Sequence, residues 1–140
     1  MKEPGSRPGS RGQALVETAI TIPLMVLLLL GFLAVLIRIE AQVELDAATG
    51  LAAAAAVSAP AGSPLSATYA EESWHGTLHQ YPYLEPGRLQ GCGAYQPDQP
   101  VTCEGTATLD YGRTPMGMVV PLPIQLRSTA TAWSSPYRSR

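Results

Sequence analysis

Three groups of side chains in this sequence are of types that can carry chemistry. Glu17 is an acid at the front of a long uncharged run. His75 and His79 stand four residues apart, and Cys92 and Cys103 are the two cysteines of the chain. Glu17 could provide an ion pair at a membrane, the histidines a metal site and the cysteines a disulfide bond.

The histidine pair is a weak candidate, and we predict no metal site. On a helix, Glu71, His75 and His79 would share one face, so joint coordination of zinc is geometrically possible. However, the segment ESWHGTLH is not an HExxH motif, and Gly76 weakens a helix between the two histidines. The same face is the natural solvent side of an amphipathic helix. We therefore expect these side chains to be solvated.

Nothing else in the sequence indicates catalysis. It shows no Ser-His-Asp set, no pair of catalytic acids and no glycine-rich phosphate loop. The formal charge of -2 gives no basic surplus, so nucleic acid is not an expected partner. A length of 140 residues suggests one domain at most. We expect neither an enzyme nor a cofactor.

An apolar segment near the front of the chain predicts a membrane span. From Thr18 to Ile37, twenty residues carry no charge, about the number that a helix needs to cross a bilayer's hydrocarbon core. A cleaved secretory signal is the alternative. Its apolar part is normally shorter and is followed promptly by a small-x-small cleavage site. Here the run leads instead into a pattern that favours helix.

Charges on either side of the span predict its orientation. Lys2, Arg7 and Arg11 precede it, against Glu3 alone. The far side carries Arg38 and then three acids, Glu40, Glu44 and Asp46. By the positive-inside rule, the N-terminus is cytoplasmic and most of the chain lies outside the cytoplasm. We therefore expect a single-pass protein of the cell membrane.

Helical periodicity continues beyond the span. Apolar and small side chains recur at three- and four-residue steps and would form a narrow stripe of Leu36, Ile39, Val43, Ala47, Gly50, Ala54 and Val57. We expect one hydrophobic helix over residues 13–57, with a membrane half at about 18–37 and a stem at 38–57, ended by the segment SAPAGSP. The small residues would let another helix approach closely, or they reflect only the high helix propensity of alanine.

Residues 58–140 are expected to form a small extracytoplasmic α+β domain. Ser63 and Pro64 suit the start of a second helix, whose inner face would carry Ala67, Ala70, Trp74, Leu78 and Tyr81. Residues 101–111 and 124–133 alternate polar and apolar side chains, which predicts antiparallel strands with one face in solvent. The expected fold class is thus α+β: a long N-terminal helix packed with a second helix and a small antiparallel sheet.

The cysteines suit this thin domain, and we predict a Cys92–Cys103 disulfide. Disulfides persist outside the cytoplasm, where this orientation places both residues. Closing the loop between them would stabilise the fold by about 3 kcal/mol in the chain-entropy model. Two thiols alone make a poor metal site, and the sequence has no CxxC motif that would suggest redox chemistry.

The most specific pattern lies at the front of the long helix. A short basic leader, residues 1–12, ends in Gly12; four residues follow, beginning with Gln13, and then come Glu17 and the span. This pattern resembles the N-terminus of TadE-like proteins, the pseudopilins of tight-adherence (Flp-type) pilus systems and relatives of type IV pilins. The proline within the span, Pro23, the small residues of the stem and the late Ala/Thr-rich strand are also similar to these proteins.

The resemblance implies how the front of the helix is processed and used. A prepilin peptidase would cut between Gly12 and Gln13, leaving Glu17 as the fifth residue. Glu17 would then meet the N-terminal amine of a neighbouring subunit and set the helix register during assembly, which would offset a cost of about 2 to 3 kcal/mol for an unpaired carboxylate in the membrane. Alternatively, Glu17 is solvated at headgroup level and merely suits a helix N-terminus. Pro23 leaves the carbonyl of Ala19 without its helical donor, so we predict a kink there.

Two functional hypotheses follow. In the first, the chain is a minor pseudopilin, processed after Gly12, whose helix packs for pilus assembly and adhesion. Its partners would be the prepilin peptidase, other pilin or pseudopilin subunits, platform proteins of the assembly system and membrane lipid, and assembly would bring it to the pilus or cell surface. In the second, the chain is an unprocessed single-span anchor that carries a binding or adhesion module.

Overall fold

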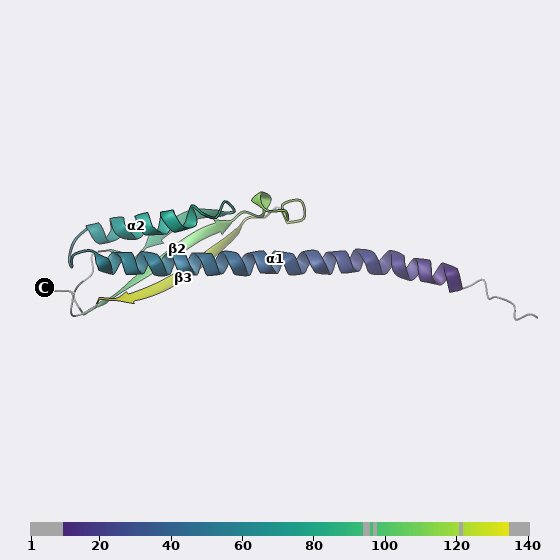
Figure 1. The fold of residues 1–140 in the computed structure, drawn as a ribbon, viewed down its shortest axis with the longest axis horizontal. Coiled ribbons are helices and arrows are strands. Elements are labelled where there is room, and N and C mark those ends of the chain that lie inside the picture. Colours follow the sequence, from purple (N-terminus) through teal and green to yellow (C-terminus); the bar gives the residue numbers. More distant parts are fainter. Residues whose placement is uncertain (1–9, 94–95, 97, 121, 135–140) are drawn as a thin grey trace, which may run out of the picture. The chain divides into compact units, whose positions relative to one another are not determined.

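The computed structural model describes residues 10–93, 96, 98–120 and 122–134, with only the backbone described for residues 10–14. The chain divides into two compact units, Met1–Leu36 and Ile37–Arg140. The elements, in chain order, are α1 (Ser10–Ser58), α2 (Leu65–Leu78), β1 (Leu84–Gln90), β2 (Pro100–Leu109), the 3-10 helix η1 (Tyr111–Arg113) and β3 (Ile124–Trp133) (Figure 1). The predicted α+β fold with a long N-terminal helix is confirmed.

The first unit contains the apolar half of α1. The helix is long and apolar enough to cross a membrane by its length and composition, and its most apolar window has no residue buried inside the chain. α1 begins at Ser10, three residues before the predicted Gln13, and it includes Gly12. It continues as α-helix past Pro23. The predicted kink at Pro23 remains a prediction.

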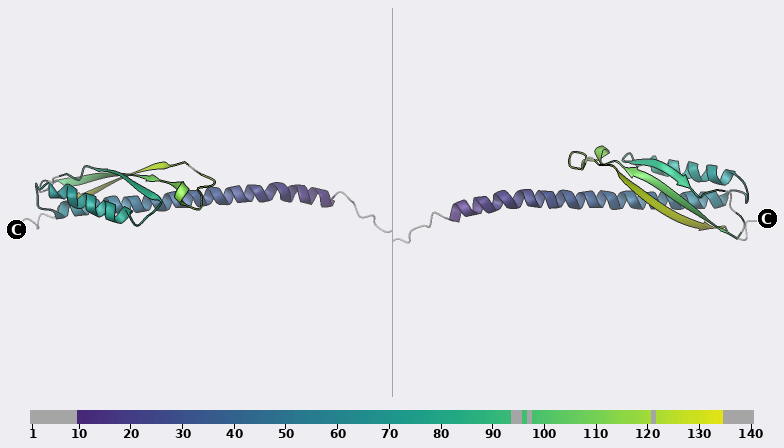
Figure 2. Two further views of the ribbon diagram at one scale, coloured as in Figure 1. Left: turned by 90° about the horizontal axis from the view of Figure 1, so that it is seen from above. Right: turned by 180° about the vertical axis from the view of Figure 1, so that it is seen from behind.

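The second unit is built on a three-stranded antiparallel sheet in the order β1-β2-β3. β2 and β3 pair without interruption from Pro100 opposite Trp133 to Leu109 opposite Ile124. The alternation predicted for β2 is confirmed, since its apolar residues after Pro100 are buried and the polar residues between them are exposed or half-buried. The alternation in β3 is also seen, but one of its inward positions holds a buried polar residue, Ser128, and Trp133 is exposed. α2 and the stem of α1 cover the inner face, while the outer face is open to solvent (Figure 2).

The sequence did not predict β1, which falls within a segment interpreted as loop. Pro86 and Gly87 interrupt its pattern, and proline is tolerated in a sheet only at edges or bulges. β1 is an edge strand, and its register with β2 shifts between Pro86 and Leu89. The opposite edge, β3, is regular, and there the side-chain amide of Gln42 on α1 donates to the carbonyl of Arg127 at 3.1 Å.

The stem uses a different face from the stripe noted in the sequence. Its buried face consists mostly of alanines, with every member at most 1% exposed: Ala41, Leu45, Ala48, Thr49, Ala52, Ala53 and Ala56. In contrast, Ile39 and Val43 of the stripe are more than half exposed. Both sets recur with helical period, so periodicity alone could not choose between them. The alanine face is the one that packs, because its small side chains let the sheet and α2 come close to the helix.

The inner face of α2 is largely as predicted. Ala70, Trp74 and Leu78 are fully buried, while Ala67 and Tyr81 are only half-buried and Ser66 completes the inner face. The helix begins at Leu65, one residue after the predicted Pro64. The Ser63 hydroxyl accepts a hydrogen bond from the Leu65 amide at 3.2 Å, as expected of a residue at a helix start.

The two helices and β2 meet at Gly105. A Cβ on this residue would lie 2.7 Å from Oγ1 of Thr49 on α1 and 3.1 Å from Nε1 of Trp74 on α2. Thr49 is held in place by donating to the carbonyl of Leu45 at 2.8 Å. The indole of Trp74 is completely buried, and its Nε1 has no hydrogen-bond partner among the described atoms. The three elements can approach this closely only because residue 105 lacks a side chain.

We predict that Gly105→Ala destabilises the outer domain by about 1 to 3 kcal/mol, because the added methyl group must displace buried atoms of α1 and α2. The measurement is urea unfolding of the full chain in mild detergent, followed by the near-ultraviolet circular dichroism of Trp74.

Gly76→Ala is the matched control, because a Cβ there meets nothing within 4 Å. Since Gly76 lies inside α2, alanine should raise stability by up to about 1 kcal/mol. Equal effects of the two substitutions would contradict the close packing at Gly105.

Candidate functional site

Glu17 lies in the apolar half of α1 with its side chain exposed at the helix surface. Its neighbours on the helix are mixed in character, with Ile20 one turn later, 65% exposed, and the polar Thr21 beside it. Gly12 and Gln13 lie in α1 just before it, and their side chains fall outside the described part of the chain. Four residues separate Gln13 from Glu17, about 6 Å along the helix axis.

The predicted disulfide is confirmed. Cys92, which follows β1, is bonded to Cys103 in β2 with an S–S distance of 2.04 Å and a Cα–Cα distance of 4.9 Å. Both residues are buried. The turn that leads to Cys92 depends on Gly91, whose φ is +81° and whose Cβ would lie 2.3 Å from the carbonyl oxygen of Thr102. The sequence pattern Gly-Cys is thus needed to bring the thiol against the central strand.

The two histidines do not form a centre with other metal-binding groups. His75 and His79 are exposed on α2, and no group of three or more His, Cys, Asp or Glu residues within the described ranges could hold a metal ion. They border a hollow of 400 Å³ at the end of α2. Arg113 also lines this hollow, but it forms a salt bridge with Glu85 and donates to the carbonyl of Pro82 at 3.3 Å. The guanidinium of Arg113 is therefore already paired within the domain.

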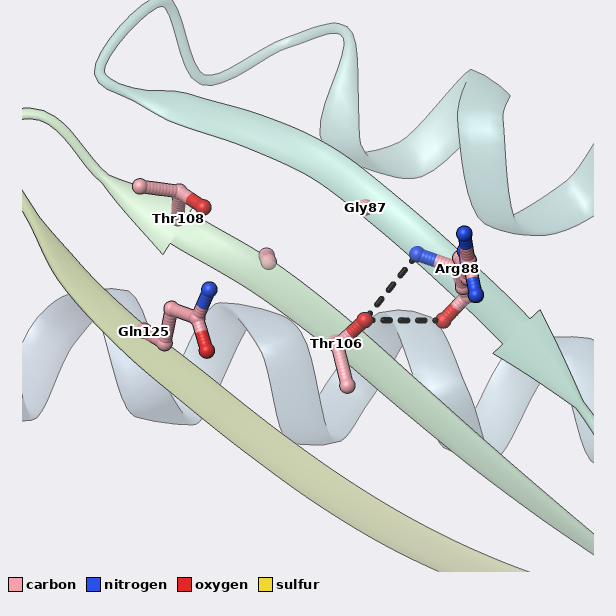
Figure 3. Close-up of a pocket in the computed structure, with 6 residues that line it drawn as sticks. Gly87, Arg88, Thr106, Thr108 and Gln125 are labelled. Carbon is pink, nitrogen blue, oxygen red and sulfur yellow. Dashed lines mark hydrogen bonds between the residues drawn. The ribbon is translucent and has the colours of Figure 1, made fainter.

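A second hollow, on the solvent face of the sheet, is explained by the irregularity of β1 (Figure 3). Thr106 Oγ1 accepts from the Arg88 amide at 3.0 Å and donates to the Arg88 carbonyl at 3.2 Å, closing the bulge. A Cβ on Gly87 would lie 2.7 Å from the carbonyl oxygen of Thr106. The depression above Gly87 thus results from a close approach of two strands, and we assign it no ligand.

Sequence reasoning missed a polar cluster at the start of the stem. Glu40 and Glu44 stand one turn apart on α1, and their carboxylates lie near the phenol groups of Tyr83 and Tyr81, respectively. The two tyrosine rings meet edge to face with centroids 6.1 Å apart. The sequence contains only two indirect signals of this cluster: two acids four residues apart on the helix, and a Tyr-Pro-Tyr segment later in the chain. This cluster fastens the end of α2 and the beginning of β1 to the stem.

The cluster changes the acidity of both tyrosines. The hydrogen bond to Glu44, followed by partial burial and the nearby negative charges, raises the pKa of Tyr81 above its usual value of 10.0. Burial is the main cause that raises the pKa of Tyr83, followed by the charges of Glu40 and Glu44. Folding therefore favours the protonated phenols. Their contribution to stability is fully present below pH 10.0 and is lost as the pH rises through the folded-state pKa values.

No protein-family model, curated protein or solved structure matches this chain.

We predict that replacing Tyr81 and Tyr83 together by phenylalanine weakens the fold at neutral pH and flattens its loss of stability in alkali. Without the hydroxyls, no phenol has to lose its proton beside Glu40 and Glu44 as the pH rises. Unfolding free energies of the full chain in detergent, measured from pH 8 to about pH 12, test this expectation.

Tyr69→Phe serves as the control, because it removes an exposed hydroxyl from α2 without touching the stem. An unchanged alkaline slope in the double variant, equal to that of the control, would refute the role of the two Tyr–Glu pairs.

Proposed function

We propose that this chain is a minor pseudopilin of a tight-adherence (Flp-type) pilus system, held in the membrane by the apolar half of α1. The observation that carries the proposal is Glu17, with Gly12 five positions before it and an uncharged helix after it. The continuous helix, which leads into a small disulfide-bonded α+β unit, supports the proposal because disulfides persist outside the cytoplasm.

The position of Glu17 gives it a role that needs a second subunit. A carboxylate in a membrane helix costs about 2 to 3 kcal/mol unless it is paired. A cut by a prepilin peptidase between Gly12 and Gln13 would create an ammonium group about 6 Å away along the helix axis. In assembly, the ammonium of one subunit pairs with Glu17 of the next. Both charges are then neutralised together, and the pairing fixes the helix register.

The outward face of the stem supports the same proposal. Ile39, Val43 and Leu51 are between 52% and 57% exposed, on the side of α1 opposite the face that packs against the sheet. Apolar side chains gathered in this way favour contact with another molecule. Between them, a Cβ on Gly50 would meet nothing within 4 Å, so a neighbouring helix could approach there. Stems of neighbouring pilin or pseudopilin subunits are the proposed occupants.

This function implies a location and a sequence of partners. The N-terminus lies in the cytoplasm and the α+β domain outside it, because the basic residues precede the span. The peptidase cleaves the chain first. The cleaved chain then contacts the platform proteins of the assembly system, and its helix finally packs against other subunits. The finished chain is part of the pilus or cell surface and serves adhesion. An unprocessed anchor with a binding module is the competing function, and processing separates the two.

We predict that the protein isolated from its native membrane begins at Gln13, because the peptidase removes residues 1–12. Intact-mass measurement and sequencing of the N-terminal peptide, with and without the cognate peptidase, test this directly. Gly12→Val should leave the leader attached, since a branched side chain replaces the glycine at the cut.

Gly9→Val is the matched control within the leader and should be processed normally. A chain that keeps its leader in the presence of the peptidase would favour the competing function, an ordinary membrane anchor.

We predict that Glu17→Ala abolishes pilus assembly while membrane insertion and cleavage continue. The substitution removes the carboxylate that pairs with the neighbouring amine but makes the helix more apolar. Glu17→Gln should have the same effect, because it keeps the shape and loses only the charge. Electron microscopy of surface filaments and membrane fractionation measure the two outcomes.

Thr18→Ala, at the adjacent position, should leave filament number unchanged. Normal filaments in the Glu17→Ala strain would show that Glu17 does not serve assembly.

A further inference from the structure

The loop between β2 and β3, residues 110–123, exposes apolar side chains at its tip. Met118 is 99% exposed, Leu122 68% and Val119 49%. Single exposed apolar residues are common on protein surfaces, but three within five positions indicate a contact with another apolar phase. Neither the membrane helix nor the pseudopilin assignment accounts for them.

The loop has an ordered structure that presents these side chains outward. Met116, two residues from Met118, is only 1% exposed and fixes the loop to the domain. The carbonyl of Met116 accepts hydrogen bonds from the amides of Val119 and Val120, both at 2.9 Å. A Cβ on Gly117 would lie 2.8 Å from the Cα of Gly112, so the loop folds back tightly on η1. The exposure of the tip is therefore a property of the fold.

The loop lies at the end of the second unit where the stem begins. The amide of Asp110 donates to the carbonyl of Tyr83 at 2.9 Å. On the β3 side, the side-chain amide of Gln42, near the start of the stem, donates to the carbonyl of Arg127 at 3.1 Å, three residues after β3 begins. The loop also joins the ends of β2 and β3 at the Leu109–Ile124 pair, whereas the opposite end of the sheet carries the Pro100–Trp133 pair (Figure 1).

We propose that the loop tip inserts into the lipid interface. This inference rests on the anchoring part of the proposed function. The uncharged segment of α1 ends at Ile37, and Gln42, which is hydrogen-bonded to the end of β3 that the loop joins, follows after about one and a half helical turns. In the anchored chain, the loop would therefore face the bilayer surface. Tyr81 and Tyr83 lie at the same end, and tyrosine favours the headgroup region.

The contact gives the outer domain a second attachment to the membrane. A helix alone leaves a domain free to tilt about the point where it leaves the bilayer. With Met118, Val119 and Leu122 placed about 5 to 10 Å into the interface, the domain is held against the lipid before assembly. Release of the loop from lipid then becomes part of the transfer into a fibre.

The test uses the full chain in phosphatidylcholine and phosphatidylglycerol vesicles, with tryptophan as the probe. Trp74 is buried and provides a constant background. The variant Met118→Trp/Trp133→Phe reports on the loop tip, and Trp133→Phe alone gives the background. The natural chain is the matched control, because Trp133 is 70% exposed at the opposite end of the sheet. Leu122→Trp/Trp133→Phe is a second probe, and disulfide formation checks folding of each variant.

We expect lipids brominated near the headgroup to quench both loop probes, and lipids brominated near the acyl-chain end to quench them less. Trp133 in the natural chain should not be quenched. A loop probe that iodide quenches in vesicles as strongly as it quenches the exposed Trp133 would overturn the proposal. A probe shielded from both iodide and brominated lipid would also overturn it and would identify a protein contact instead.

Flotation of the vesicles in alkaline carbonate separates this inference from its premise. A chain that does not float refutes both the membrane anchoring and the loop contact that depends on it. A chain that floats but shows no lipid quenching refutes the loop contact alone.

Discussion

Close packing of an alanine face is the constraint on which the outer domain depends. Five of the buried stem residues are alanines, and their size lets α1 lie directly against β2 and α2. The volume that they leave is filled from the other side by Trp74, Leu78 and Leu109, all completely buried. Gly105 marks the closest point, where a single methyl group would collide with both helices. A core of so few large side chains gains little from burial, so the disulfide at the far end of the sheet matters more here than in a larger domain.

Three polar contacts complete the attachment of the domain to the helix. The Tyr–Glu pairs join the end of α2 and the start of β1 to the beginning of the stem, and Gln42 joins β3 to the same stretch of α1. Together they fasten both edges of the sheet near the point where α1 enters the domain. In the proposed pseudopilin, this arrangement would make the stem and the outer domain move as one body while the apolar half of α1 is exchanged between lipid and neighbouring helices.

The sequence predicts those parts of the fold whose signals are local. The alternation in β2 and β3, the start of α2 and the disulfide follow from residue type and spacing, and the structure agrees. β1 was missed because Pro86 and Gly87 break its pattern at an edge, where the sheet tolerates them. The packed face of the stem was missed because two faces of an alanine-rich helix share one period. The Tyr–Glu cluster joins residues about forty positions apart in the chain, a separation that no local pattern encodes. The role of Glu17 differs again, since its proposed partner belongs to another subunit.

The hydrogen bond from Gln42 to Arg127 has a consequence for the sheet as a whole. β3 is a ten-residue edge strand without proline or bulge, the kind of edge that recruits further strands and leads to aggregation. The stem covers part of this edge with a side-chain amide that occupies one of its carbonyls. α1 therefore protects part of this edge from pairing with another strand. A version of the second unit trimmed past Gln42 would leave this carbonyl exposed, which would favour pairing of β3 with a second copy.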